Sequence, residues 1–70
     1  MNIEQLRRIL DQQHTGSHVM IQIENQMILG RSRGQFISLP LNDPLFEKIS
    51  GTNIIAIGSH PTTGLLTIYV

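Results

Sequence analysis

The chain has 70 residues, no cysteine, and five lysines and arginines against five aspartates and glutamates. This length fits one domain over residues 1–70, whose single core contributes roughly 3–5 kcal/mol. The lack of cysteine excludes disulfides and thiolate-bound zinc and favours a cytoplasmic setting. Zero net charge excludes a global attraction to nucleic acid, and no apolar run approaches the roughly 20 residues that span a bilayer. We therefore expect a soluble protein without membrane contacts.

Residues 2–13 carry the period of an amphipathic helix. Asn2 and Gln5 have the spacing of a capping box, in which each side chain accepts a hydrogen bond from the backbone of the other. The apolar stripe then recurs every three or four residues, at Ile3, Leu6, Ile9 and Leu10. Gly16 can adopt the left-handed conformation that ends a helix, so we expect the end between Gln13 and Gly16.

The period changes to two from His18 onward, which predicts a half-buried strand. Its inward positions are Val19, Ile21 and Ile23. A tight turn around Asn25 leads to a second strand at 27–29, and the two make a hairpin. A third strand is expected at 35–39, and Pro40 either ends it or confines it to an edge of the sheet.

Residues 42–51 fit two alternatives. Asn42 or Asp43 followed by Pro44 is typical of a helix start, and a short helical turn would then end at Gly51. A strand through Leu45 is the other interpretation, and we favour the helix. Residues 53–59 and 65–70 form the arms of a hairpin around the turn at 60–64.

These elements predict an α+β fold. An N-terminal helix packs on a strongly twisted, mainly antiparallel sheet of about five strands, with a short helical turn after Pro44. The last hairpin is apolar on both faces. One face is expected in the core, with Ile55, Ile57, Leu66, Ile68 and Val70. The other face keeps Met20, Ile54, Ala56, Leu65 and Tyr69. Either the sheet closes into a small barrel, or this second face is an interface with another copy or a partner.

The segment Gly30–Gly34 is the candidate ligand-binding site. Two guanidiniums, Arg31 and Arg33, flank Ser32, and Phe36 follows three residues later. In an extended segment the two arginines would point to one side and could hold a phosphate or carboxylate. The alternative is a solvated turn without a ligand.

Catalytic and metal chemistry find little support. His14 and His18 have the four-residue spacing of helical metal ligands, but Gly16 between them interrupts a helix, and His60 is expected in a turn before proline. Serines and carboxylates occur without a recognisable triad. We expect no metal, no cofactor and no enzymatic activity.

The function that these features favour is non-catalytic binding. The protein is expected to act as an inhibitor or adaptor, as many small and phage-encoded proteins do, by self-associating through an apolar sheet face or edge and engaging a macromolecular partner. The alternative is an oligomer that binds an anionic small molecule, a nucleotide or single-stranded nucleic acid through the loop that carries Arg31 and Arg33.

Overall fold

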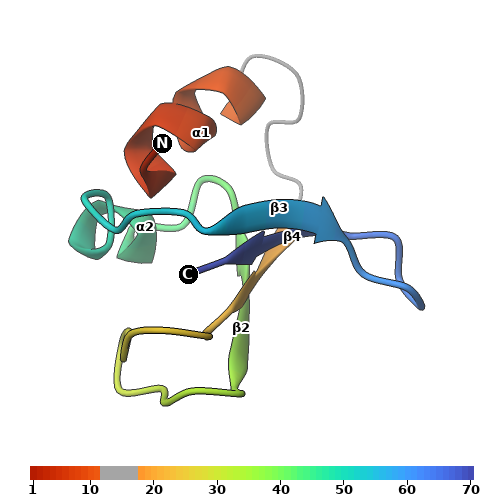
Figure 1. The fold of residues 1–70 in the computed structure, drawn as a ribbon. Coiled ribbons are helices and arrows are strands. Elements are labelled where there is room, and N and C mark those ends of the chain that lie inside the picture. The colour runs from red at the N-terminus through yellow and green to blue at the C-terminus, as the bar shows by residue number, and fades with distance from the viewer. Residues whose placement is uncertain (12–17) are drawn as a thin grey trace.

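The computed structural model describes residues 1–11 and 18–70. These contain the helices α1 (Ile3–Asp11) and α2 (Leu45–Lys48) and the strands β1 (His18–Gln22), β2 (Phe36–Pro40), β3 (Ala56–Ser59) and β4 (Leu66–Tyr69). The strands form one sheet in the order β2-β1-β4-β3. The segment between β1 and β2 extends away from both helices (Figure 1). The expected helix end between Gln13 and Gly16 lies outside the described residues.

The start of α1 confirms the capping box. The Asn2 N–H donates to Gln5 Oε1, and the Gln5 N–H donates to Asn2 Oδ1, both at 2.9 Å. The Glu4 N–H donates to the carbonyl oxygen of Ser50 at 3.0 Å, and Asn2 forms a β-bridge with Asn53. Donors of the first helical turn are thus satisfied partly by the chain around residue 50, which fixes the helix to the rest of the fold.

The sheet is mixed, and it is not closed into a barrel. β1 pairs antiparallel with β2 and parallel with β4, so that Ile21 lies between Ile37 and Ile68. β3 pairs antiparallel with β4 and completes the expected C-terminal hairpin. The expectation of about five strands is therefore corrected to four, and of the two alternatives for the sheet the closed barrel is wrong, while two of the three strand pairings are antiparallel as expected.

The missing strand is the one expected at residues 27–29. Both sides of β1 are occupied, by β2 and by β4, so a hairpin partner that follows β1 directly has no edge to join. Residues 27–29 instead lie in a loop, where Ile28 and Arg31 form an isolated bridge. The apolar residues at 27–29 suggested a strand. A local pattern of this kind does not show whether the neighbouring strand has a free edge to pair with.

The segment after Pro44 is a short helix, as favoured, and not a strand. Asp43 Oδ1 accepts a hydrogen bond from the Leu45 N–H at 2.8 Å, and Phe46 is buried in the core. An ion pair of 2.9 Å joins Arg7 Nη1 of α1 to Glu47 Oε1 of α2. The two helices are thus linked on the side of the sheet that holds the core.

The core lies between the helices and one face of the sheet. It is a single cluster to which α1, α2, β1, β2 and β4 all contribute, among others through Ile3, Leu6, Val19, Ile21, Leu39, Phe46, Ile68 and Val70. The expected core positions of the first strand and of β4 are confirmed, since Val19, Ile21, Ile23 and Ile68 are all buried.

The start of β3 departs from the expected alternation. Tyr69 is opposite Ala56 in the ladder, yet its carbonyl oxygen accepts the N–H of Ile55 at 2.8 Å. Two consecutive residues therefore face one, which is the arrangement of a β-bulge and shifts the alternation by one position. Ile54 consequently packs against the core, whereas Ile55 is exposed. Ile57 shares the core side of the sheet with Ile68 but is also exposed, because β3 is an edge strand.

Helix α1 offers a matched pair of variants that tests its docking. Leu6 is 7% exposed and Ile9 is 50% exposed, so the same truncation removes a core contact in one case and surface area in the other. We expect Leu6→Ala to lower the free energy of unfolding by about 2–5 kcal/mol and Ile9→Ala by about 0.5 kcal/mol. Urea denaturation followed by circular dichroism measures both. Equal losses in the two variants would show that α1 does not dock through this face.

Candidate functional site

One face of the sheet carries two rows of side chains in direct register across the four strands. The first row is Phe36, Gln22, Tyr69 and Ala56, and the second is Ser38, Met20, Thr67 and Gly58. We call these residues the open face. None of them is charged, and both helices place their buried residues on the opposite side of the sheet. The open face is therefore a neutral surface with no helix over it in the part of the chain that the structure describes.

The open face is partly shielded by its own side chains. A Cβ atom on Gly58 would lie 3.6 Å from Tyr69 Cε2, so the tyrosine ring extends over the glycine of the neighbouring strand. Met20 and Thr67, in the two central strands, are buried. Exposure is concentrated at the two outer strands, at Phe36 on β2 and at Ala56 on β3. A partner would therefore meet apolar groups at both sides and the tyrosine between them.

The structure brings together three of the five residues expected at an interface. Met20, Ala56 and Tyr69 belong to the open face, whereas Ile54 packs against the core and Leu65, just before β4, lines a pocket. The bulge at the start of β3 separates Ile54 from the other expected interface residues. No pattern in the sequence predicts this bulge. Phe36 belongs to the open face, and its alternation with Ile37 could have indicated this. The interface role of all these residues stays a prediction.

The chain between β1 and β2 forms a closed loop, residues 24–35, which we call the arginine loop. At its base Ile23 donates its N–H to the Gln35 carbonyl at 2.9 Å and accepts the Gly34 N–H at 2.8 Å. Ile28, in the middle of the loop, is buried and anchors it to the core. The arginine loop is thus held at its base and at one internal point, although it lies outside the sheet.

Two tight turns shape the part of the loop that carries the arginines. Ile28 and Arg31 exchange both backbone hydrogen bonds, at 3.1 and 2.8 Å, around Leu29 and Gly30. These two residues have φ of 50° and 75°, the sign that a two-residue type I′ turn requires at both positions. Glycine adopts this conformation freely, whereas a leucine there costs about 1–2 kcal/mol. The loop therefore holds Leu29 in an unfavourable backbone conformation.

The second turn covers residues 32–35 and changes the interpretation of the expected anion site. The Ser32 N–H and hydroxyl both donate to Gln35 Oε1, at 2.7 and 3.2 Å, and the Gln35 N–H donates to the Ser32 carbonyl. The donors of Ser32 are therefore used inside the loop. Arg31 and Arg33 are exposed, and neither forms an ion pair with any described residue. Phe36 belongs to the open face, beyond the base of the loop.

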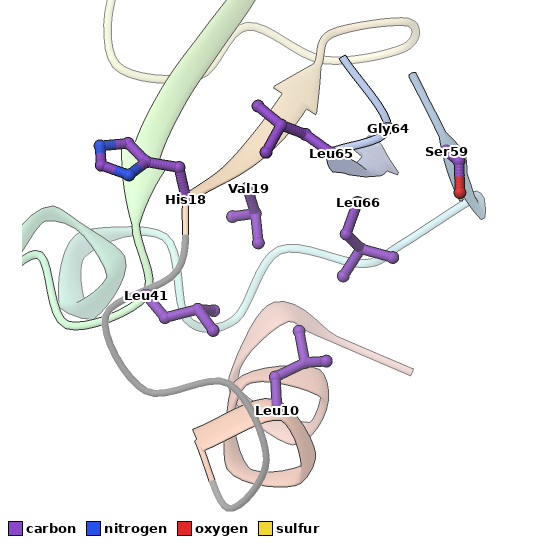
Figure 2. Close-up of a pocket in the computed structure, with 8 residues that line it drawn as sticks. All are labelled: Leu10, His18, Val19, Leu41, Ser59, Gly64, Leu65 and Leu66. Atoms are coloured by element: carbon purple, nitrogen blue, oxygen red, sulfur yellow. The ribbon is translucent and has the colours of Figure 1, made fainter. Parts of the chain in front are cut away.

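An apolar pocket of about 330 Å³ lies between the end of α1, the start of β1 and the β3–β4 hairpin. Figure 2 shows Leu10, Val19, Leu41, Leu65 and Leu66 around it. His18 and Ser59 also line the pocket, but Figure 2 places them at opposite ends, with the imidazole turned away from the leucines. The described lining residues thus offer apolar contact and no serine–histidine pair.

His18 and His60 belong to no group of potential metal ligands in the described part of the chain. His60 Nδ1 accepts hydrogen bonds from the backbone N–H groups of Thr62 and Thr63, both at 3.3 Å, so this imidazole stabilises the hairpin turn, as expected. Residues 1–11 and 18–70 contain no cluster of three or more histidine and acidic side chains suited to a metal ion. His14 lies outside the described residues.

Comparison with known proteins adds no relative from which a site could be carried over. No protein-family model, curated protein or solved structure matches this chain. Neither of the two helices in the described residues has the length and apolar character that crossing a bilayer needs. The candidate surfaces are therefore argued from their own geometry.

The backbone conformation of Leu29 can be tested with two substitutions that remove the same side chain. Asparagine tolerates positive φ better than alanine does, so we expect Leu29→Asn to be more stable than Leu29→Ala by about 0.5–1 kcal/mol. Chemical denaturation of both variants measures this difference. If the alanine variant is equally stable, residue 29 does not hold a left-handed conformation in solution.

Proposed function

We propose that this protein is a non-catalytic binding module that associates with itself through the open face and presents the arginine loop to a partner. The observation that carries the proposal is the uncharged pair of rows across the sheet, with Phe36 and Ala56 exposed at its two sides. A neutral sheet face with exposed apolar groups is a common site of protein association. An isologous two-fold dimer is the simplest assembly that covers it.

The size of the open face indicates how strong this association can be. Strands about 4.8 Å apart and residues spaced about 3.3 Å along them give two rows a footprint of roughly 250 Å². Stable complexes bury about 800 Å² on each partner, and so a dimer held by this face alone is weak. The exposed Ile55, adjacent to Ala56, can extend the contact. We therefore expect association that depends on protein concentration in the micromolar range.

The second candidate function uses Arg31 and Arg33 to bind an anionic small molecule or single-stranded nucleic acid. Its support is that both guanidiniums are exposed and lack an ion pair within the described residues. The engagement of the Ser32 donors with Gln35 weakens it, because a phosphate site would use such donors. We therefore favour self-association through the open face, with a protein as the partner of the arginine loop.

The self-association is best tested at Ala56. This side chain is small and exposed, so Ala56→Lys adds a charge to the open face without removing packing, unlike a change at the partly buried Tyr69. We expect size exclusion with light scattering at about 10–500 μM to show dimers for the parent and a larger monomer fraction for Ala56→Lys. Thr62→Lys, at the exposed tip of the β3–β4 hairpin, is the control that should leave the dimer intact. A folded monomer throughout this range for the parent would refute the proposal.

A further inference from the structure

The arginine loop carries exposed apolar side chains as well as its two cations. Met27 is 72% exposed, and Leu29 is 36% exposed at the first turn. Both precede Arg31 in the same closed loop, which Figure 1 shows extending away from the helices. A methionine this exposed is a flexible, polarisable contact group of a kind that binding surfaces use often. The loop therefore offers dispersion contacts and positive charge together.

Neither arginine of the loop forms an ion pair with any residue that the structure describes. The cations of α1 have acidic partners: Arg7 pairs with Glu47 at 2.9 Å and with Glu4 at 4.0 Å, and Arg8 pairs with Glu4 at 3.2 Å. Glu24, at the start of the loop, accepts a hydrogen bond from Gln22 Nε2 at 2.8 Å instead of contacting an arginine. Arg31 and Arg33 are thus available to bind an external anion, although the net charge of the whole chain is zero.

Resting on the proposed function, we propose that the arginine loop recognises an acidic segment of a partner protein in which carboxylates alternate with other residues beside an aliphatic side chain. The Cα atoms of Arg31 and Arg33 are at most about 7 Å apart, since one residue separates them. Carboxylates at alternate positions of an extended peptide are about 6.6 Å apart, a span that two long arginine side chains two positions apart on a turn can reach. Each guanidinium can then bind one carboxylate in the bidentate geometry that arginine favours.

A protein segment fits the loop better than a nucleic acid does. Bases stack on aromatic rings, whereas the exposed apolar groups of the loop are Met27 and Leu29. Two arginines release only a few counterions from a phosphate backbone, and a chain of zero net charge supplies no further attraction. The loop is also closed and anchored before binding, which reduces the conformational entropy lost on recognition.

The probe is a synthetic peptide, Glu-Ser-Glu-Ser-Leu-Ser-Leu, titrated into ¹⁵N-labelled protein and followed by NMR. We expect amide shifts confined to residues 24–36 and a Kd of about 0.1–1 mM, the range of a short flexible peptide. The double variant Arg31→Gln/Arg33→Gln should weaken binding about tenfold or more, and Met27→Ser severalfold. The matched controls Lys48→Gln and Gln26→Ser alter exposed side chains elsewhere and on the loop, and should bind as the parent does.

Two further probes distinguish binding of an acidic peptide from binding of an uncharged peptide and of a nucleic acid. The peptide with both glutamates replaced by glutamine should bind about tenfold more weakly, because the charge-assisted pairs are lost. An oligothymidylate of about twelve nucleotides should bind more weakly than the peptide at physiological salt. The inference is overturned if the peptide causes no shifts up to about 5 mM, if the double arginine variant binds it as the parent does, or if the oligonucleotide binds more tightly.

The same variants keep this inference separate from self-association. Arg31→Gln/Arg33→Gln should leave the oligomeric state unchanged, and Ala56→Lys should leave peptide binding unchanged, because the two surfaces share no residue that is altered. Loss of peptide binding with an intact dimer would refute only the role of the arginine loop. A monomeric parent that still binds the peptide would refute only the role of the open face.

Discussion

The parallel pairing of β1 with β4 is the constraint on which the rest of the structure depends. It joins Ile21 to Ile68 across most of the chain length and continues past the strands, where the Val70 N–H donates to the Gln22 carbonyl at 3.0 Å. Because β2 pairs with the other side of β1, residues 24–35, which directly follow β1, have no edge of β1 left to pair with. The arginine loop is exposed for this reason, and the open face exists because two short helices cover only one side.

What could be predicted from the sequence is the part that local chemistry determines. The capping box of Asn2 and Gln5, the short helix after Pro44 and the C-terminal hairpin all depend on residues close together in the chain, and all are present. The parallel ladder could not be predicted, since a period of two shows that a strand forms and not which strand it joins. The assignment of residues 27–29 to a strand was wrong because of that missing information.

The arginine loop and the open face could likewise be predicted only in part from local sequence. The exposed Arg31 and Arg33 could be identified from their glycine-flanked segment, but the hydrogen bonds of Ser32 to Gln35 depend on a turn that the sequence does not reveal. The predicted interface set was divided by a single extra residue at the bulge, which turned Ile54 inward and Ile55 outward. A change of one position in a strand moves a side chain to the other face, so interface predictions from alternation are sensitive to such bulges.

The place of β4 also constrains the order in which the fold can form. During synthesis β1 leaves the ribosome more than forty residues before its parallel neighbour, and β3 has no partner in the sheet other than β4. Local elements such as α1 can form early, and most of the core residues, from Ile3 to Ile49, precede β4, but the core lacks Ile68 and Val70 until residues 66–70 arrive. Closing so long a segment delays the gain from its contacts, and so we expect the pairing of β1 with β4 to follow the local pairing of β1 with β2. β4 thus completes the sheet from a central position, between β1 and β3.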